Sequence, residues 1–270
     1  MIETLPRSCY YDFGFLILGD VLWRTLLKWV QTNRLNHYGF VAGVIMKKDQ
    51  QERRLGPLVA YAGTYDSERR KHYVGDVYYN FALVEEHPNV LDCFAQNLGV
   101  RLARYKITAV VAAPLGGIGL AQALARILQC RFLYAEKEIL EIAETGKKEK
   151  SKLIWGRHQV EAGDAVIIVE DVCNNFSTTE KLWKLITDCS ARVVVIVCAL
   201  NRSGQTSFVI IRPSFCITIP VISVINKPLV QYRQEDPEIV RYILGGNVIW
   251  DPKKEWSLLQ EIMERQKTRA

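Results

Sequence analysis

Hydrophobic residues form short unbroken runs through the middle of the chain, and segments with helical spacing separate these runs. The runs cover residues 109–113 (AVVAA), 132–135 (FLYA), 165–169 (AVIIV), 193–200 (VVVIVCAL) and 221–225 (VISVI). A strand that is apolar at every position is typical of a parallel sheet, because helices cover both faces of such a sheet. We therefore expect an α/β core in which helices flank a parallel sheet.

Three further segments place apolar residues at the spacing of an amphipathic helix. They are residues 20–35, 88–105 and 120–128. Residues 41–80 instead contain short β-like pieces between glycines, together with several tyrosines. We expect three parts: an N-terminal helical and β-rich region at 1–85, the α/β core at 86–235 and a helical tail at 236–270.

Composition and charge narrow the classes of partner. The 270-residue chain is 49% hydrophobic and 24% charged, with a formal net charge of +6. No stripe of basic residues alternates with aromatic residues, so we expect no nucleic-acid partner. The apolar residues 13–19 end at Asp20 and are too few for a signal peptide or a membrane span. The seven cysteines form no CxxC pair, which favours reduced thiols in a cytoplasmic protein without a structural zinc site.

The segment after the run at 165–169 carries the most informative chemistry. Glu170 and Asp171, here called the acid pair, end the predicted strand, and small polar residues including Ser177, Thr178 and Thr179 open a helix. Free amides at a helix N-terminus bind phosphate, and carboxylates accept hydrogen bonds from sugar hydroxyls. This pattern predicts a site for a phosphorylated sugar. A capping box at Ser177 and Glu180 and a structural salt bridge at the acid pair are the alternative interpretations.

A second polar turn follows the run at 109–113. Residues 113–117 (APLGG), here called the glycine turn, precede an alanine-rich helix, and backbone amides of Gly116 and Gly117 could approach an anion closely. The pair Gly117 and Gly119 also suggests a dinucleotide-binding fingerprint, but Gln122 replaces its third glycine. An oxidoreductase that uses a nicotinamide cofactor is therefore the weaker interpretation. Close packing of strand against helix also explains Gly119.

Segment 166–180 resembles the signature of type I phosphoribosyltransferases, in which apolar residues and two acids precede a Thr-Thr-Gly-Gly-Ser turn. The glycine turn resembles the pyrophosphate loop of the orotate group in that family. The resemblance implies a phosphoribosyltransferase-type core and an N-terminal hood region over the base. It also implies a pentosyltransferase that moves ribose 5-phosphate from phosphoribosyl pyrophosphate to a nitrogenous base, with an orotate-like pyrimidine favoured. Mg²⁺ held mainly through the substrate and a homodimer are further implications.

The resemblance also implies roles for individual residues. Glu170 and Asp171 match the acid pair that contacts the ribose hydroxyls, and Asp171 is the candidate protein ligand for Mg²⁺. Lys137 matches a basic residue that closes over the pyrophosphate, and the charged stretch 136–152 is expected to be a flexible loop. The matching phosphate and pyrophosphate contacts are Gly116, Gly117, Asn174, Asn175, Ser177, Thr178 and Thr179.

Three departures from the family pattern favour an alternative function. Asn174 and Asn175 replace the two threonines, Phe176 stands where the family has glycine, and Glu136 stands where the family has arginine before its lysine. A non-catalytic regulatory protein that binds phosphoribosyl pyrophosphate would tolerate these changes. Lys47 is the sequence candidate for a contact with the acceptor base.

Overall fold

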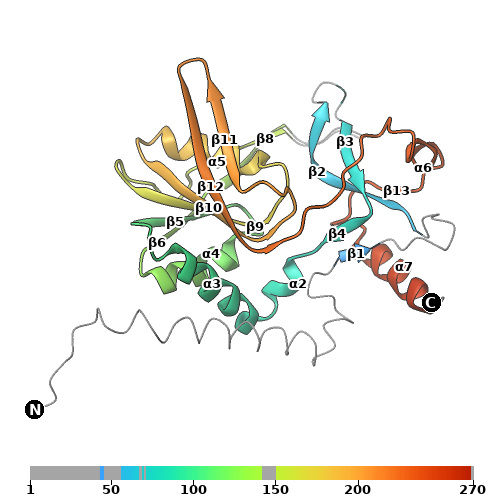
Figure 1. Cartoon of the computed structure of the whole chain (residues 1–270), viewed down its shortest axis with the longest axis horizontal. Helices are drawn as coiled ribbons and strands as arrows, with labels where there is room; N and C mark the ends of the chain where they lie inside the picture. Colours follow the sequence, from blue (N-terminus) through green and yellow to red (C-terminus); the bar gives the residue numbers. More distant parts are fainter. Residues whose placement is uncertain (1–42, 46–55, 67–68, 70, 142–149, 269–270) are drawn as a thin grey trace, which may run out of the picture. The chain divides into compact units, whose positions relative to one another are not determined.

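The computed structural model describes residues 43–45, 56–66, 69, 71–141 and 150–268 (Figure 1). The chain divides into two compact units, whose described residues fall within 82–226 for the first unit and within 43–81 and 227–268 for the second. The predicted helix at 20–35 and the candidate Lys47 lie outside the described residues.

The first unit contains a six-stranded sheet with the order β11-β12-β10-β9-β5-β6. Neighbouring strands from β12 to β6 run parallel, and only β11 pairs antiparallel within this sheet. The predicted parallel sheet is therefore confirmed. Its strands are β5 (Ala109–Ala112), β6 (Arg131–Tyr134), β9 (Ala165–Cys173), β10 (Arg192–Asn201), β11 (Ser207–Arg212) and β12 (Phe215–Asn226).

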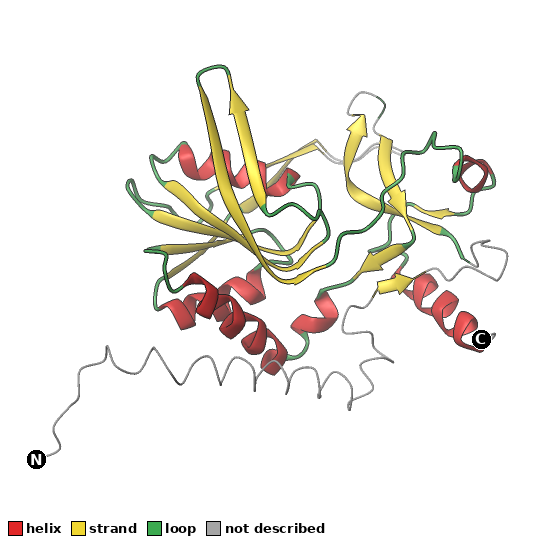
Figure 2. Cartoon of the chain, in the orientation of Figure 1, coloured by secondary structure: helices red, strands yellow, loops and turns green. Residues whose placement is uncertain are grey.

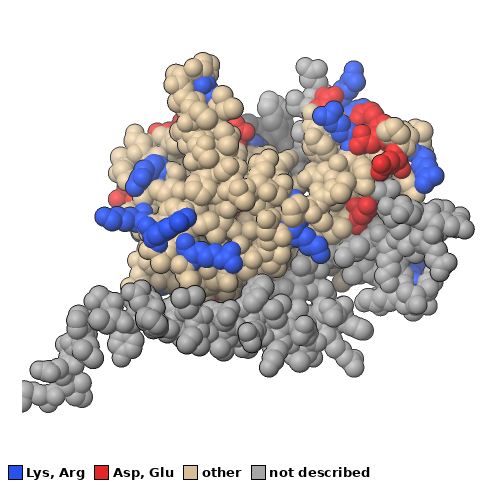
Figure 3. Space-filling view, in the orientation of Figure 1, with Lys and Arg blue, Asp and Glu red and all other residues tan. Residues whose placement is uncertain are grey.

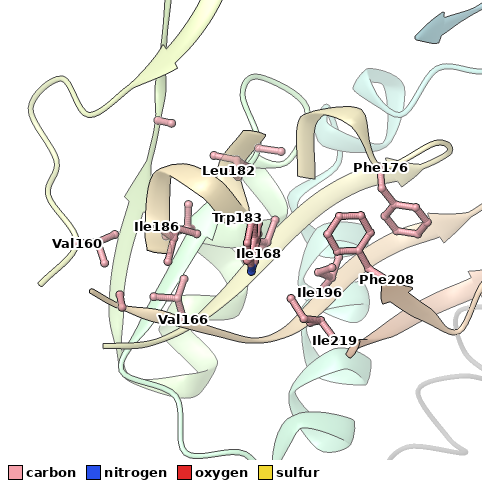
Figure 4. Packing of buried hydrophobic residues seen from close by; sticks show 14 of the residues in the cluster. Val160, Val166, Ile168, Phe176, Leu182, Trp183, Ile186, Ile196, Phe208 and Ile219 are labelled. Atoms are coloured by element: carbon pink, nitrogen blue, oxygen red, sulfur yellow. The ribbon is translucent and has the colours of Figure 1, made fainter. Parts of the chain in front are cut away.

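Helices cover both faces of this sheet (Figure 2). The short α2 (Ala82–Glu85) leads into α3 (Pro88–Leu102), which lies with α4 (Ile118–Leu128) on one face, and α5 (Ser177–Thr187) covers the other. The apolar side chains of α5 pack on β9, β10 and the β11–β12 hairpin in one buried cluster (Figure 4). Burial on both faces explains why the central strands are apolar at almost every position.

The order of the strands creates a topological switch point, at which two neighbouring strands are followed by connections that lead to opposite sides of the sheet. α4 connects β5 to β6, α5 connects β9 to β10, and β6 and β10 lie on opposite sides of the neighbouring pair β5 and β9. In open α/β sheets, ligands bind outside the carboxyl ends of strands at such a point. The turns after β5 and β9 are the glycine turn and the segment after the acid pair, so both candidate segments lie at this edge of the sheet, here called the carboxyl edge.

A polar network joins the three strands β5, β6 and β9 at their opposite, amino ends. The Thr108 hydroxyl donates a hydrogen bond to the Asp164 carboxylate at 2.6 Å, and the Glu161 amide donates to the same carboxylate at 2.8 Å. Arg131 forms an ion pair with Asp164, whose side chain is only 9% exposed. Thr108, Arg131 and Asp164 each stand at or just before the start of a strand. This network therefore fixes the amino ends of the three strands relative to one another.

The charged stretch 136–152 is only partly a loop. Its ends form the antiparallel strands β7 (Glu136–Glu141) and β8 (Lys150–Ile154), so the loop prediction is wrong for these residues. Opposite charges face each other across the pair, as in the Glu138–Lys152 ion pair at 2.7 Å, and such cross-strand pairs stabilise a hairpin. Residues 142–149 lie outside the described residues.

The second unit contains small sheets and two helices. β13 pairs with β2, β2 pairs with β3, and β1 pairs with β4, which agrees with the β-rich character expected for 41–80. The tail contributes strand β13 as well as helices, because Val248 and Ile249 pair with the start of β2. The elements are β1 (Gly43–Ile45), β2 (Leu58–Asp66), β3 (Lys71–Gly75), β4 (Val77–Tyr79), α6 (Val240–Leu244), β13 (Val248–Ile249) and α7 (Trp256–Thr268).

Three further observations concern the described residues. Among the described helices, none combines the length and apolar character that crossing a lipid bilayer requires. The described cysteines are free thiols, of which Cys173 and Cys198 are buried and Cys216 is exposed. On the face in Figure 3, Lys and Arg side chains lie in small separate groups with broad uncharged areas between them.

Candidate functional site

The acid pair lies inside strand β9 rather than at its end. β9 continues to Cys173, two residues beyond Asp171, so the expectation that the acids end the strand is wrong in this detail. The extension arises because β10 still pairs with β9 at this level, with Leu200 opposite Val172. On the other side of β9, β5 pairs only as far as Val169, so Asp171 faces the glycine turn on that side instead of a further residue of β5.

Asp171 lies directly against the glycine turn. A β-carbon added to Gly116 would be 2.2 Å from the Oδ2 atom of Asp171, so only glycine fits with this carboxylate in place. The Val172 amide donates a hydrogen bond to Oδ1 of Asp171 at 2.7 Å, which orients the carboxylate. The Ala113 amide donates a hydrogen bond to the Val169 carbonyl at 2.8 Å, which fixes the start of the turn to β9. The turn contains a cis peptide between Pro114 and Leu115.

Gly117 is confined by backbone rather than by a side chain. A β-carbon on Gly117 would lie 2.3 Å from the Val169 carbonyl oxygen and 3.0 Å from the Ala113 carbonyl oxygen. The Gly117 residue also begins α4, because the Ala121 amide donates to its carbonyl at 2.9 Å. The glycines therefore allow the turn to approach β9 and start the helix at once.

Glu170 points toward the first turn of α5. The Thr179 hydroxyl donates a hydrogen bond to Oε1 of Glu170 at 3.3 Å, and Thr179 is 1% exposed. Thr179 thus orients a member of the acid pair in this state, which differs from the direct phosphate contact expected from the sequence. Ser177 is exposed and Thr178 is partly exposed, so both remain open to solvent at the start of the helix.

The helix α5 starts differently from a capping box. Its N-cap is Phe176 and not Ser177, and the Glu180 amide donates to the Phe176 carbonyl at 2.8 Å. Glu180 forms an ion pair with Arg212 at 3.2 Å instead of reaching back to the N-cap. The capping-box interpretation is therefore wrong. The side chain of Asn175 accepts a hydrogen bond from the Ser177 amide at 3.3 Å, which places a neutral oxygen at the helix N-terminus.

Phe176 adopts a left-handed backbone conformation, with φ of 57° and ψ of 16°. Glycine occupies this region without cost, whereas a side chain makes it unfavourable by about 1 kcal/mol or more. The Phe176 ring is 6% exposed and packs on Phe208 of the β11–β12 hairpin with 5.5 Å between ring centroids (Figure 4). Burial of the ring offsets the unfavourable backbone, so the left-handed turn is maintained without a glycine.

Sequence reasoning missed a further carboxylate at this edge. Glu85, the last residue of α2, lies against Gly119 in the first turn of α4, with Oε1 3.2 Å from the position that a β-carbon on Gly119 would take. Burial, followed by the negative charge of Asp171, raises the pKa of Glu85 to about 7, although the backbone of Gly119 opposes this rise. Nothing in the sequence around Glu85 marks it, because it belongs to a four-residue helix without a motif.

The other candidates lie on neighbouring elements of the same unit. Lys137 is exposed on β7, three residues after the end of β6, and β6 is adjacent to β5 in the sheet. Arg202 follows β10 at the carboxyl edge, is 5% exposed, and its amide donates to the Cys173 carbonyl at 2.8 Å. The sequence alone assigned no role to Arg202.

A bound metal ion would need oxygen, nitrogen or sulfur ligands from nearby side chains. Within the ranges that the structure describes, no group of three or more His, Cys, Asp or Glu side chains is arranged to hold one. Mg²⁺ commonly binds through one or two carboxylates together with phosphate oxygens of a substrate. Asp171 is a partly buried carboxylate beside Gly116, so it fits this mode of binding as a single protein ligand.

The chain is similar to known proteins over this region. A family described as the phosphoribosyl transferase domain matches residues 84–233. An orotate phosphoribosyltransferase of Caldanaerobacter subterraneus is 25% identical over 162 residues, which cover 60% of this chain and 75% of that protein. One of Thermotoga maritima is 30% identical over 127 residues, covering 47% of this chain and 63% of that protein.

The fold comparison gives a further similarity. The crystal structure of an adenine phosphoribosyltransferase from Thermoanaerobacter pseudethanolicus is 19% identical, with a TM-score of 0.45, and the match covers 56% of this chain and 89% of that chain. The chain spans less than two thirds of the length of the Thermotoga relative.

Proposed function

Because the chain belongs to the phosphoribosyl transferase family, we propose that it transfers ribose 5-phosphate from phosphoribosyl pyrophosphate to a ring nitrogen of a small base. The sequence prediction of a type I phosphoribosyltransferase, a pentosyltransferase, is confirmed at the level of the family. The observation that carries the proposal for this chain is the close approach of Asp171 to Gly116. It brings an acceptor of hydrogen bonds from a sugar next to the turn that leads into α4.

In the proposed site, the ribose, the pyrophosphate and the 5-phosphate of the donor contact different groups of residues. Glu170 and Asp171 accept hydrogen bonds from the ribose hydroxyls, and Gly116 and Gly117 contact the pyrophosphate. The 5-phosphate lies at the N-terminus of α5, where the amides of this turn and the hydroxyls of Ser177 and Thr178 donate to it, while Thr179 orients Glu170. To bind there, the phosphate replaces the Asn175 side chain at the Ser177 amide.

The reaction breaks the bond between the anomeric carbon and the pyrophosphate oxygen and forms a bond from that carbon to the base nitrogen. Pyrophosphate leaves with the electron pair of the broken bond, and the base nitrogen supplies the pair for the new bond and loses its proton. The transition state gains positive charge on the sugar, so the protein contributes by positioning and by charge. We assign Lys137 to stabilising the departing pyrophosphate.

Mg²⁺ is proposed as the cofactor, held mainly through donor oxygens with Asp171 as the protein ligand. When bound, it neutralises charge on the pyrophosphate. The residues of the acid pair keep the sugar oriented while this charge develops, and the Val172 amide keeps Asp171 in the required orientation.

An orotate-like pyrimidine is the proposed acceptor, and the similarity to two orotate phosphoribosyltransferases supports it. Orotate carries a carboxylate, which requires a cation or several donors for binding. Arg202 is buried at the carboxyl edge and is our candidate for this contact. We further propose a cytoplasmic homodimer, a hood region at 1–85 over the base, a catalytic core at 86–235 and a tail at 236–270.

Pyrophosphate release tests this proposal. The purified chain is mixed with phosphoribosyl pyrophosphate and Mg²⁺, and orotate, uracil, adenine, hypoxanthine and nicotinate are added separately. Release with orotate supports the proposal, and release with another base corrects the acceptor. Donor binding by calorimetry without release with any base would favour the non-catalytic regulatory protein, which the side chain at Phe176 makes the second candidate. A chain that does not bind the donor at all would contradict both.

A further inference from the structure

A carboxylate of the chain itself occupies the start of helix α4. Oε1 of Glu85 is 3.2 Å from the position that a β-carbon on Gly119 would take, so this carboxylate lies against the backbone of the first helical turn. Gly119 is the second residue of the 11-residue helix α4, which begins directly after the glycine turn. The first amides of a helix attract anions because they carry no partner within the helix.

The position of Glu85 matters because the donor is an anion. The proposed pyrophosphate contacts, Gly116 and Gly117, immediately precede the helix turn that Glu85 contacts. Glu85 also lies near enough to Asp171 for their negative charges to repel each other. A pyrophosphate group at the glycine turn would add further negative charge to a place where two carboxylates already disfavour each other, and repulsion between like charges is strong where water is scarce.

We infer that Glu85 is a specificity-determining residue that opposes the binding of the pyrophosphate half of the donor at the glycine turn. The inference rests on the proposed function. In it, Glu85 and the incoming anion compete for the first turn of α4, so the donor binds only when it displaces this carboxylate. Glu85 therefore weakens the affinity for pyrophosphate-bearing molecules without touching the ribose or the base.

The burial of Glu85 agrees with this role. Its side chain is partly buried, and burial together with Asp171 raises its pKa to about 7. Burial and the negative charge of Asp171 both disfavour a negative charge at this place. They therefore also disfavour a pyrophosphate group that lies there. The neighbouring Glu86, by contrast, is exposed, so it offers a control of the same residue type one position away.

The test is calorimetric titration of the full chain at pH 8 with inorganic pyrophosphate and Mg²⁺, and then with phosphoribosyl pyrophosphate and Mg²⁺. Glu85→Gln keeps the size of the side chain and one of its oxygens, but removes the charge. We expect it to bind both molecules about tenfold more tightly than the unaltered chain. Glu86→Gln should change neither affinity by more than about twofold. Circular dichroism checks the fold, and Glu85→Ser provides a second neutral variant.

The outcomes separate this inference from the proposed function. Tighter binding by Glu85→Gln supports the inference, and so does binding by that variant alone. If the unaltered chain binds the donor and both neutral variants bind equally or more weakly, the inference is overturned while the proposed function stands. If neither the unaltered chain nor the variants bind, both are overturned. A purely structural role of Glu85 would not tighten the binding of an anion.

Discussion

Gly116, in the turn after β5, and Asp171, on β9, meet so closely that a methyl group on Gly116 would lie 2.2 Å from an oxygen of Asp171. We predict that Gly116→Ala turns this carboxylate aside and weakens donor binding at least about tenfold. The obstructing atoms belong to a side chain, which can move, so the midpoint of thermal unfolding should fall little. Calorimetric titration and thermal unfolding measured together check this prediction.

Gly117→Ala provides the contrasting case. Its methyl group would meet the Val169 carbonyl oxygen at 2.3 Å and backbone atoms of Ala113. Because backbone in a central strand cannot move aside cheaply, this variant should lose about 2 kcal/mol or more of unfolding free energy. Equal loss of stability by both glycine variants would show that Asp171 does not yield to the new methyl group.

Asp171→Asn should reduce the affinity for the donor at least about tenfold. The amide retains one oxygen for the Val172 amide but loses the charge and one acceptor for ribose hydroxyls. Asp188→Asn is the control, because Asp188 pairs with Lys184 on the exposed side of α5. Calorimetry that finds unchanged donor affinity in Asp171→Asn would remove the assigned role.

Phe176→Gly tests how the turn before α5 is maintained. Glycine relieves the left-handed backbone, which contributes about 1 kcal/mol, but it removes a buried ring worth about 3 kcal/mol or more. The net effect should be a loss of about 2 kcal/mol in unfolding free energy, measured with urea. Phe208→Leu, a smaller change on the partner ring, should cost less because most of the buried volume stays. A stabilised Phe176→Gly chain would mean that strain outweighs packing at this turn.

Asp164 gives the chain a defined response to acid. Burial alone raises the pKa of Asp164, but hydrogen bonds from Thr108, from the Glu161 amide and from Arg131 outweigh burial and lower it below its ordinary value. The folded state therefore holds this group ionised more strongly than the unfolded state does. Its contribution is complete above the ordinary carboxyl pKa and is lost as pH falls through the lowered value.

We predict that Asp164→Asn unfolds more easily than the unaltered chain at neutral pH and that the difference shrinks as the pH is lowered. Thermal unfolding between pH 7 and pH 3 measures this. A difference that stays constant over this range would show that the ionised state of Asp164 contributes nothing to stability.

Sequence patterns predicted the parts of the molecule that burial determines. The apolar runs beside Glu170 predicted both the parallel sheet and the edge at which the acid pair lies, since such runs have few other uses. The conformation of Phe176 could not be predicted, because it depends on a ring of the β11–β12 hairpin more than thirty residues away. Glu85 could not be identified from the sequence either. Its importance depends on its proximity to Gly119 of α4 and on the charge of Asp171 in β9, and both lie far from it along the chain. The same applies to β13, whose two residues are a strand only because β2 is beside them.

The network of Thr108, Arg131 and Asp164 sits at the end of the sheet that is remote from the acid pair. A frame that is secured at one end leaves the sequence of the loops at the other end comparatively free to change during evolution. Replacement of a Thr-Thr-Gly turn by Asn174, Asn175 and Phe176 is a change of that kind. The chain can therefore retain its architecture while its preference among substrates, or even its ability to turn them over, drifts away from that of its relatives.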